Sequence, residues 1–566
     1  MPSIIRVNLT GQSVSREETP GEYALLGGRA LTSRLVLREV PPRCDPLGAE
    51  AKLVFAPGLL GGTAATTSGR VSFGGKSPLM GGCKEANVGG TLGYRLSKLG
   101  VKAVVIEGRA ADEAWRVLRI DAAGARLEPA PVRLVGLGAY DTCARLLDGP
   151  SREGRTATAV CIGPAGEQQL GAASIAVSDP EGRPTRHAAR GGLGALMGAL
   201  RLKAIVVNDE GTKYVEAAEK NGYRALVTGF SKTTLEDPRT KNMSAYGTAG
   251  VLKFVNREQV SSLPTRNHRL GTFAGGERIS GQRIAELAPE RGGKMLPCMA
   301  GCVIKCAILF NDARGEHLTS ALEFETITLL GSNLEIDDLD AVAQMDRLCD
   351  DLGLDTIETG NAFGVGMEAG VAPFGDWQAA LRLFDEVRRG TELGRVLGGG
   401  VVAVARHFGI DRVPAIKGMG LPAWEPRTLK AMGITYATSP QGADHTAGLV
   451  TARGVTPETY LKASRHEQVL QAAVDSVGLC QFSNPTADDM AKFVSAQHGI
   501  AWSPDDVMAL GRRCLLDERE FNLAAGIGRD AAQIPAFLRI EPLATPDGPS
   551  AFDLPDELID SFWDEL

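Results

Sequence analysis

The sequence of 566 residues predicts an α+β fold, in which a sheet-rich N-terminal domain precedes a mainly helical part. Two patterns support this prediction. Short β-branched runs separated by turns fill residues 1–208, and helical periodicity with charged faces dominates after residue 209. In addition, 43% of the residues are hydrophobic, which is enough to build several buried cores.

The individual elements follow from local composition. Strands are expected where β-branched residues cluster, at residues 3–9, 52–55, 102–106, 157–162 and 204–207. Helices are expected where apolar residues recur with the helical period, at residues 215–229, 339–352, 377–389 and 457–477. Residues 260–295, rich in Gly, Arg and Ser, predict a long connecting loop, and residues 550–566 predict an acidic tail.

Charge and segment composition exclude two classes of protein. The formal net charge is −7, whereas proteins that bind nucleic acid or anionic membranes are usually basic. The N-terminus has no basic segment followed by an apolar core, and no run of 18 uncharged apolar residues occurs. We therefore expect a cytoplasmic protein with neither nucleic acid nor membrane as partner.

Glycine-rich segments predict sites for anions. Residues 58–93 hold eleven glycines, with Arg70, Lys76 and Asn87 among them, and Arg186 and Arg190 precede a second pair of glycines at 191–192. Backbone amides and cationic side chains in such segments suit phosphate. Neither segment has the P-loop or the dinucleotide pattern, so direct use of NAD is not expected.

Three of the ten cysteines lie within nine residues, at positions 298, 302 and 306, and Cys480 is a candidate fourth ligand. Four thiolates suit a [4Fe-4S] cluster or a tetrahedral zinc. Zinc ligands usually come as two separated pairs, so three close cysteines and one remote cysteine favour the iron–sulfur cluster. Zinc and a chance grouping remain as alternatives.

One pattern occurs twice, D-x-x-G-L-[DC], at residues 350–355 and 475–480. Each copy follows a helical stretch and places a glycine where a helix would end in the left-handed conformation. The two copies are either similar helix ends or two related loops that hold two related halves of one ligand.

Seven motifs occur in an order that resembles the tungsten-containing aldehyde:ferredoxin oxidoreductase family. They are SGRxxFxxKSP (68–78), ANVGG (86–90), RGGLGALMG (190–198), the three-cysteine group, DDLGLD (350–355), ATSPQGADH (437–445) and DSVGLC (475–480). The resemblance covers nearly the whole chain.

The resemblance implies the architecture and the cofactors of this family. The sheet-rich domain, residues 1–208, would bind pterin phosphates. Two intertwined helical domains would follow, residues 209–345 with the cysteine group and residues 346–566 with the D-x-x-G-L loops. A tungsten ion held by the dithiolene sulfurs of two pyranopterins would lie at their interface, with Mg²⁺ bridging the pterin phosphates and a [4Fe-4S] cluster nearby. Molybdenum uses the same pterin sulfurs, and no residue distinguishes the two metals.

The resemblance also assigns residues. The pterins, their phosphates or the Mg²⁺ would contact Arg70, Lys76, Asn87, Gly89, Arg186, His187, Ala189, Arg190, Asp350, Leu354, Asp355, Gln441, Asp475 and Leu479. The cluster would be held by Cys298, Cys302, Cys306 and Cys480. Two differences stand out: the first cysteine is displaced by one residue from the family's C-x2-C-x3-C spacing, and Gln441 stands where a basic residue is common.

Two side chains are predicted to act on the substrate. In the expected helix over residues 318–330, Glu323 suits a capping box with Ser320. Glu325, about 200° round the helix, is then the carboxylate that faces the site. The family uses the histidine of the GADH segment, here His445, next to the metal, and Asp444 would orient its ring.

The resulting prediction is an aldehyde oxidase that takes oxygen from water. Electrons would leave through the cluster to ferredoxin or a small iron–sulfur subunit, with a flavoprotein subunit conceivable beyond it, in a homo- or hetero-oligomer. The alternative is the catalytic subunit of a tungsten-dependent aryl-CoA reductase, which would need a wide pocket and a further metal ligand such as Cys349. A more remote alternative is a non-catalytic binding paralogue.

Overall fold

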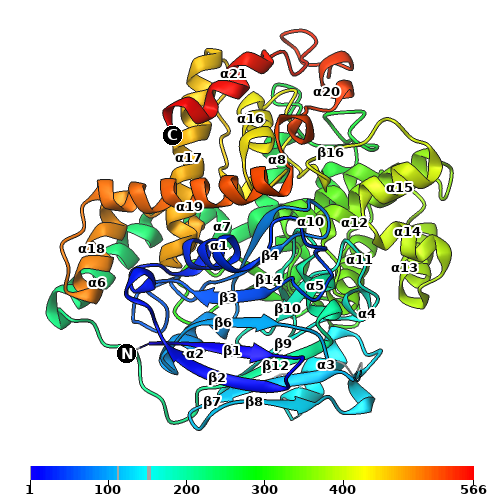
Figure 1. The fold of residues 1–566 in the computed structure, drawn as a ribbon. Helices are drawn as coiled ribbons and strands as arrows, with labels where there is room; N and C mark the ends of the chain where they lie inside the picture. Colours follow the sequence, from blue (N-terminus) through cyan, green and yellow to red (C-terminus); the bar gives the residue numbers. More distant parts are fainter. Residues whose placement is uncertain (1, 111, 113, 149–154) are drawn as a thin grey trace.

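The structure, a computed structural model, describes residues 2–110, 112, 114–148 and 155–566. A sheet-rich N-terminal part is followed by a helical part, as predicted, and Figure 1 shows the sheets in blue and cyan with the helices above and beside them. The five predicted strands are present as β1 (Ser3–Asn8), β3 (Leu53–Pro57), β6 (Val101–Glu107), β9 (Ala157–Cys161) and β12 (Leu202–Asn208).

Two six-stranded sheets in the described part of the chain share one topology. Their strand orders are β2-β1-β6-β3-β4-β5 and β8-β7-β12-β9-β10-β11. In each sheet a hairpin comes first, three antiparallel strands follow, and the sixth strand inserts parallel to the first. The remaining strands are β2 (Ser13–Glu18), β4 (Val71–Lys76), β5 (Cys83–Val88), β7 (Arg116–Asp121), β8 (Gly124–Pro129), β10 (Ile175–Val177) and β11 (Arg186–Ala188).

The helices of this part repeat in the same way. Each hairpin leads into a helix, α1 (Gly28–Glu39) or α3 (Ala139–Leu146), and each fifth strand leads into another, α2 (Leu92–Lys98) or α5 (Leu193–Ala199). The short α4 (Pro164–Glu167) follows β9. The N-terminal part is therefore built from two halves of equal topology, each with its own glycine pair before α2 or α5.

The helical part contains the long helices that the periodicity predicts, α11 (Leu339–Leu352), α13 (Trp377–Arg389) and α17 (Pro457–Val477). The helix expected at residues 215–229 instead runs from Lys220 to Glu236 as α6. The residues expected to form the first turn of this helix are extended instead. There Val215 N donates to the Gly62 carbonyl, and Ala218 N donates to the Gln497 carbonyl. The other elements are α7 (Pro238–Tyr246), α8 (Leu252–Val255), α9 (Gly281–Glu290), α10 (Phe324–Leu329), α12 (Thr356–Glu368), α14 (Glu392–Gly398), α15 (Val401–Phe408), α16 (Lys430–Thr438), α18 (Ala487–His498), α19 (Pro504–Ala525), α20 (Ala536–Ile540), α21 (Asp556–Asp560) and strands β13 (Lys294–Leu296), β14 (Ala307–Asn311), β15 (His317–Thr319), β16 (Ala415–Ile416) and β17 (Met419–Gly420).

Two expectations about irregular segments were wrong. The stretch 260–295 is not one long loop, because Ser280 caps α9 there by accepting from Arg283 N. The acidic C-terminal stretch is not a free tail: it folds into α21 and a 3₁₀ turn, and Phe562 is fully buried against the helical core. Burial of the apolar side chains in this stretch stabilises the folded form more than repulsion between its acidic side chains destabilises it.

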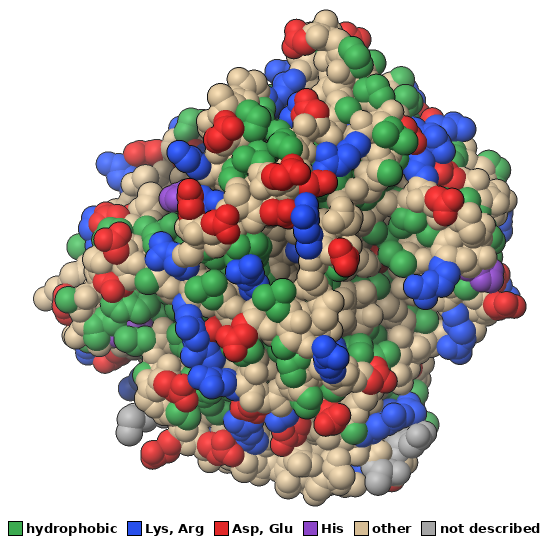
Figure 2. Space-filling model, turned by 45° about the horizontal axis from the view of Figure 1, so that its top comes forward, with side chains coloured by type: hydrophobic (Ala, Val, Ile, Leu, Met, Phe, Trp, Pro, Cys, Tyr) green, Lys and Arg blue, Asp and Glu red, His purple; other side chains and the backbone are tan. Residues whose placement is uncertain are grey.

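The helices form two main cores whose members are interleaved along the chain. One core joins α10 and α12 to residues 534–562, and the other joins α6 to α17, α18 and α19. The described residues contain no helix that is long and apolar enough to cross a membrane. Acidic and basic side chains are interspersed over the face shown in Figure 2, so no patch of one charge dominates that face.

Candidate functional site

The two D-x-x-G-L copies are helix ends that dock on equivalent places of the two N-terminal halves. Gly353 ends α11 and Gly478 ends α17, with φ of 73° and 89°. A Cβ on Gly58, just after β3, would lie 2.2 Å from Gly478 Cα, and a Cβ on Gly353 would lie 2.9 Å from the nitrogen of Gly163, just after β9. The first interpretation of the repeat is therefore confirmed, since both copies are left-handed caps, and the two loops dock at equivalent places.

The carboxylates of the two loops face equivalent positions too. Arg29, at the start of α1, donates to Asp475 at 3.5 Å, and the Tyr140 hydroxyl, at the start of α3, donates to Asp350 at 3.2 Å. His187 Nε2 lies 3.1 Å from the other oxygen of Asp350. Leu354 and Leu479 are buried beside these carboxylates.

The four predicted cysteines lie in one buried cluster with Met299 and Ile304. Cys298, Cys302 and Cys480 are buried and Cys306 is half-buried. A hydrogen bond from Cys302 lowers the pKa of Cys298 to about 6, and Arg186 and Arg70 act in the same direction. The displaced first cysteine therefore still lies with the others. In the described residues no three His, Cys, Asp or Glu side chains are grouped as the ligands of a single ion.

Predicted anion contacts surround the cysteine cluster. Arg70 donates to the carbonyl of Asn87 at 3.3 Å, and a Cβ on Gly89 would lie 3.5 Å from Cys298 Sγ. On the other side Arg186 donates to Glu323 at 3.2 Å, and its Nε is buried without a partner. Ala189 is half-buried in the loop between β11 and Gly191.

Glu325 and His445 converge from distant parts of the chain. Glu325 lies in the first turn of α10, and His445 opens a 3₁₀ turn whose preceding residue, Asp444, caps it. Glu325 Oε1 is 3.5 Å from His445 Nδ1, and neither buried atom has a hydrogen-bond partner. Burial raises the pKa of Glu325, while His445 and the Ala423 N–H oppose the rise. Both atoms are thus available to form a hydrogen bond with a ligand.

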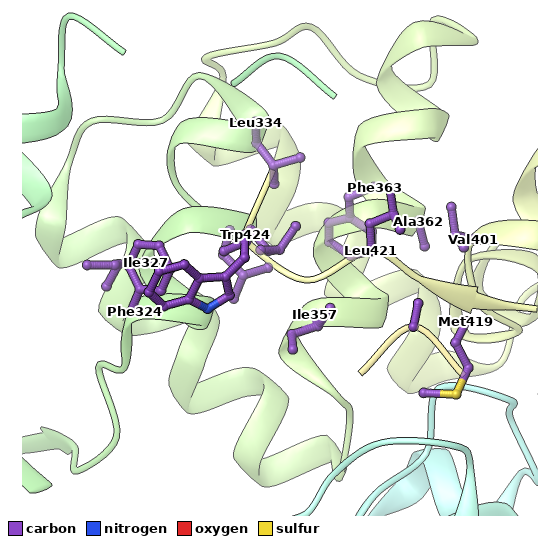
Figure 3. Close-up of a cluster of buried hydrophobic side chains, with 14 of the residues drawn as sticks. Phe324, Ile327, Leu334, Ile357, Ala362, Phe363, Val401, Met419, Leu421 and Trp424 are labelled. Atoms are coloured by element: carbon purple, nitrogen blue, oxygen red, sulfur yellow. The ribbon is translucent and has the colours of Figure 1, made fainter. Parts of the chain in front are cut away.

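A short segment, residues 419–424, holds Glu325 in place. Ala423 N donates to Glu325 Oε2 at 2.8 Å. The segment is fixed to α12 because Glu358 accepts from Gly420 N at 2.8 Å and Asn361 donates to the Leu421 carbonyl at 2.9 Å. Figure 3 shows its side chains packed in the buried core, with Trp424 near Phe324 and Ile327 and with Met419 at the far end.

Arg190 joins this segment to the loop of His445. It donates to the Gly420 carbonyl at 2.6 Å and to the Ala443 carbonyl, and its Nε lies 3.4 Å from Asp355, the cap of α12. Arg190 therefore orients both predicted catalytic residues.

Lys84, on β5, anchors the GADH loop to the first sheet. Its fully buried ammonium lies 2.8 Å from Asp444 Oδ2 and 3.2 Å from Gln441 Oε1. The same Gln441 oxygen accepts from Glu85 N at 2.6 Å, and Gln441 Nε2 is buried without a partner. Gln441 is thus anchored to β5 through its side-chain oxygen.

Two predictions about this region need correction. Lys76 is not with the other anion contacts, because its ammonium donates to the carbonyls of Pro42 and Cys44 at 2.5 Å each. Glu323 does not complete a capping box: it is itself the N-cap of α10, without a side-chain cap bond. Its side chain turns to Arg186, and the Ser320 hydroxyl bonds His317 instead.

Sequence reasoning missed Lys84, Glu358, Asn361 and the 419–424 segment. One signal was present, since Glu358 is a lone carboxylate within the otherwise uncharged residues 356–367. A buried carboxylate needs specific partners, and here they are the Gly420 and Val401 N–H groups.

The site fits the cofactors that the resemblance implies. Four converging thiols provide the donor set of an iron–sulfur cluster. Buried polar atoms without partners, namely Arg186 Nε, Gln441 Nε2 and Glu85 Oε1, lie on the elements expected to contact the pterins. The paired loops and their equivalent partners suit a ligand made of two like halves.

Comparison with known proteins gives consistent results. A family model described as the N-terminal domain of aldehyde ferredoxin oxidoreductase matches residues 4–209, and one described as its domains 2 and 3 matches residues 225–566. The chain is 32% identical to tungsten-containing aldehyde ferredoxin oxidoreductases of Pyrococcus furiosus and Thermococcus kodakarensis, over 96% of this chain and 92% of each relative.

Two further proteins are more distant. An aliphatic sulfonate oxidoreductase, WOR-like subunit, of Pyrococcus furiosus is 25% identical over 92% of this chain and 86% of its own. The solved complex BamBC of benzoyl coenzyme A reductase with 1,5-dienoyl-CoA superposes with a TM-score of 0.82, covering 100% of this chain and 94% of the other. Because the identity there is 20%, that likeness shows the fold alone.

Proposed function

Because the chain belongs to the aldehyde ferredoxin oxidoreductase family and is an oxidoreductase of that type, we propose that it oxidises an aldehyde to the carboxylic acid. Water supplies the oxygen, and each turnover releases two electrons and two protons. The observation that carries the proposal is the convergence of Glu325 and His445, each with a buried polar atom free for a ligand.

The cofactor set follows from the family and from the residues present. Tungsten-containing relatives point to a tungsten bis-pyranopterin with a bridging Mg²⁺, and the four thiols would hold a [4Fe-4S] cluster. When bound, these groups supply a two-electron redox centre and an outlet for single electrons. Arg70, Asn87, Gly89, Arg186, His187, Ala189 and the loop residues Asp350, Leu354, Asp355, Asp475 and Leu479 would hold the pterins, with Gln441 and Arg190 beside them.

The catalytic roles are assigned by position. Glu325 takes a proton from water or from the hydrated carbonyl, because its Oε1 is free and Ala423 N holds Oε2. His445 donates a hydrogen bond to the carbonyl oxygen as negative charge develops there. Phe324 and Trp424, whose rings contact each other in the buried core, would limit the access of water to Glu325.

The proposed partner is a one-electron carrier, either ferredoxin or a small iron–sulfur subunit, and the proposed location is the cytoplasm. Half-buried Cys306 is the cysteine of the cluster that is most open to solvent. An electron carrier would therefore approach from this side.

Reduction of an aryl-CoA is the second candidate, favoured by the fold shared with the benzoyl coenzyme A reductase complex. Cys349, the further metal ligand that this function would need, is fully buried on α11, and its charged neighbours are Asp346, Asp350 and Asp355. The remote alternative, a binding paralogue without catalysis, conflicts with the retention of both Glu325 and His445.

Anaerobic assays separate these functions. Holoprotein is tested with a panel of aldehydes and a viologen acceptor, and in parallel with benzoyl-CoA and reduced viologen. The proposal predicts aldehyde-dependent viologen reduction that Glu325→Gln and His445→Asn each lower by about 10²-fold or more, with tungsten retained. Turnover of benzoyl-CoA without aldehyde oxidation would support the second candidate instead.

A further inference from the structure

A cavity lies behind the GADH loop, apart from Glu325 and His445. It has a volume of about 210 Å³, is open to solvent on one side, and is lined by the end of α16, the end of α19, residues 527–534 and the C-terminal α21. Figure 1 shows α16 and α21 in the upper part of the molecule and α19 below them. Asn522, on α19, donates to the Pro440 carbonyl at 2.9 Å, so the floor of the cavity is the chain that leads into the GADH segment.

Two cations line this cavity without a carboxylate partner in the described part of the chain. Lys417 occupies the β16–β17 turn with φ of 52°, and its ammonium donates to the Ser439 carbonyl at 2.6 Å. The Arg519 guanidinium lies over the Trp563 ring, 4.4 Å from its centroid. Neither side chain forms an ion pair with a described residue.

The two carboxylates that line the cavity already form ion pairs with arginines. Asp560 pairs with Arg529 at 2.7 Å, and Asp556 pairs with Arg539 at 2.5 Å. The cavity therefore has an excess of positive charge. Burial lowers the pKa of Lys417 to about 7, in keeping with an ammonium that has no carboxylate partner.

The rest of the lining is largely apolar. Leu523, Ile527, Ile534 and Ile559 contribute aliphatic surface, and Trp563 contributes an aromatic face. A ligand that suits both parts has one anionic end and a short hydrocarbon or aryl body.

We propose that this cavity binds a small organic monocarboxylate, with its carboxylate at Lys417 and Arg519 and its apolar body against Ile534, Ile559 and Trp563. The site is separate from the catalytic residues, and its existence does not depend on the proposed reaction. Because Thr438 and Pro440 line the cavity and lead into the GADH loop, a bound carboxylate would also contact the chain that positions His445.

Isothermal titration of the anaerobic holoprotein with benzoate tests this proposal. We expect one benzoate to bind per chain and the affinity to fall at least tenfold in both Lys417→Gln and Arg519→Gln. Lys430→Gln is the control, since Lys430, at the start of α16, pairs with Asp553 at 2.5 Å and does not line the cavity. Glu325→Gln should bind benzoate as the wild type does.

A second variant fills the cavity without changing its charge. Leu523→Trp adds bulk at a half-exposed position of α19 and should abolish binding while the melting temperature stays close to that of the wild type. The proposal is wrong if benzoate does not bind, if Glu325→Gln abolishes binding while the two charge variants retain it, or if inorganic phosphate binds as tightly as benzoate. The last result would indicate attraction of any anion rather than a carboxylate site.

Discussion

At the scale of single residues, the site depends on one carboxylate oxygen and one imidazole nitrogen that form no hydrogen bond within the described protein. Glu325 Oε1 and His445 Nδ1 are 3.5 Å apart. Ala423 N fixes the other oxygen of Glu325, and Asp444 caps the turn that carries His445. Unpartnered buried polar atoms are costly, so their retention at one place indicates use by a ligand.

The pH dependence of turnover follows from the burial of Glu325. Burial raises the pKa of this carboxyl above its ordinary value. A general base acts only when deprotonated, so kcat/KM should fall as the pH drops through this raised pKa and level off above it. Glu325→Gln should remove the acid limb from whatever activity remains, whereas Glu316→Gln, an exposed carboxylate, should leave the profile unchanged. A wild-type acid limb at the pKa of an ordinary glutamate would contradict this role.

The cysteine assignment makes a separate prediction. Cys480→Ser removes the one thiol that reaches the group from the second D-x-x-G-L loop. Anaerobically purified Cys480→Ser should contain less iron and show a weaker visible absorption, because one ligand of the cluster changes from sulfur to oxygen. Cys143→Ser is the control, since Cys143 is buried elsewhere, beside Cys161. Full iron occupancy in Cys480→Ser would exclude this thiol as a ligand.

At the scale of elements, α12 positions the site through the 419–424 segment. Asn361 donates to the Leu421 carbonyl and accepts at 3.0 Å from His268, whose other ring nitrogen lies 3.4 Å from Glu425. All three side chains are fully buried. The network therefore transmits the position of α12 to Ala423 and so to Glu325.

Asn361→Ala should affect both stability and the pH profile. The Leu421 carbonyl and His268 lose a buried partner, which should lower the free energy of unfolding by about 1–3 kcal/mol. A less well aligned Ala423 N–H no longer opposes the raised pKa of Glu325, so the acid limb should move to higher pH. Denaturant melts and pH–rate profiles measure the two effects, with Gln378→Ala, an exposed amide on α13, as control. An unchanged profile would show that Asn361 has only a structural role.

At the scale of the whole molecule, two N-terminal halves of equal topology each receive one helix end of the helical part. Gly58 receives the loop of Gly478, and Gly163 receives the loop of Gly353. These contacts have no room for a side chain. The site is therefore formed where the N-terminal sheets pack against the helical part.

Gly58→Ala should disturb the packing of the Gly478 loop on the N-terminal part. Its Cβ would lie 2.2 Å from Gly478 Cα, so the second loop must shift, at a cost of about 1–3 kcal/mol or more. Gly21→Ala is the matched control, because a Cβ at Gly21 would meet nothing within 4 Å. We expect a lower melting temperature and reduced cofactor content only for Gly58→Ala. Equal melting temperatures would show that the loop adapts without cost.

Sequence reasoning was strongest where chemistry is local. The group of three cysteines, each copy of the repeated loop and the GADH segment are short stretches of sequence. Their patterns could therefore be recognised directly. Lys84 and Asn361 were missed because their partners, Asp444 and Leu421, lie 360 and 60 residues away. Lys76 was misjudged for the same reason: its proximity to Arg70 in sequence says nothing about the carbonyls of Pro42 and Cys44 that bind its ammonium.

Elemental analysis of anaerobically purified protein tests the central claim most directly. The account predicts about one tungsten and about four irons per chain, the content of one bis-pterin site and one [4Fe-4S] cluster. Molybdenum in place of tungsten would keep the site and change the metal. Zinc alone, with neither tungsten nor molybdenum, would contradict the proposed oxidoreductase chemistry.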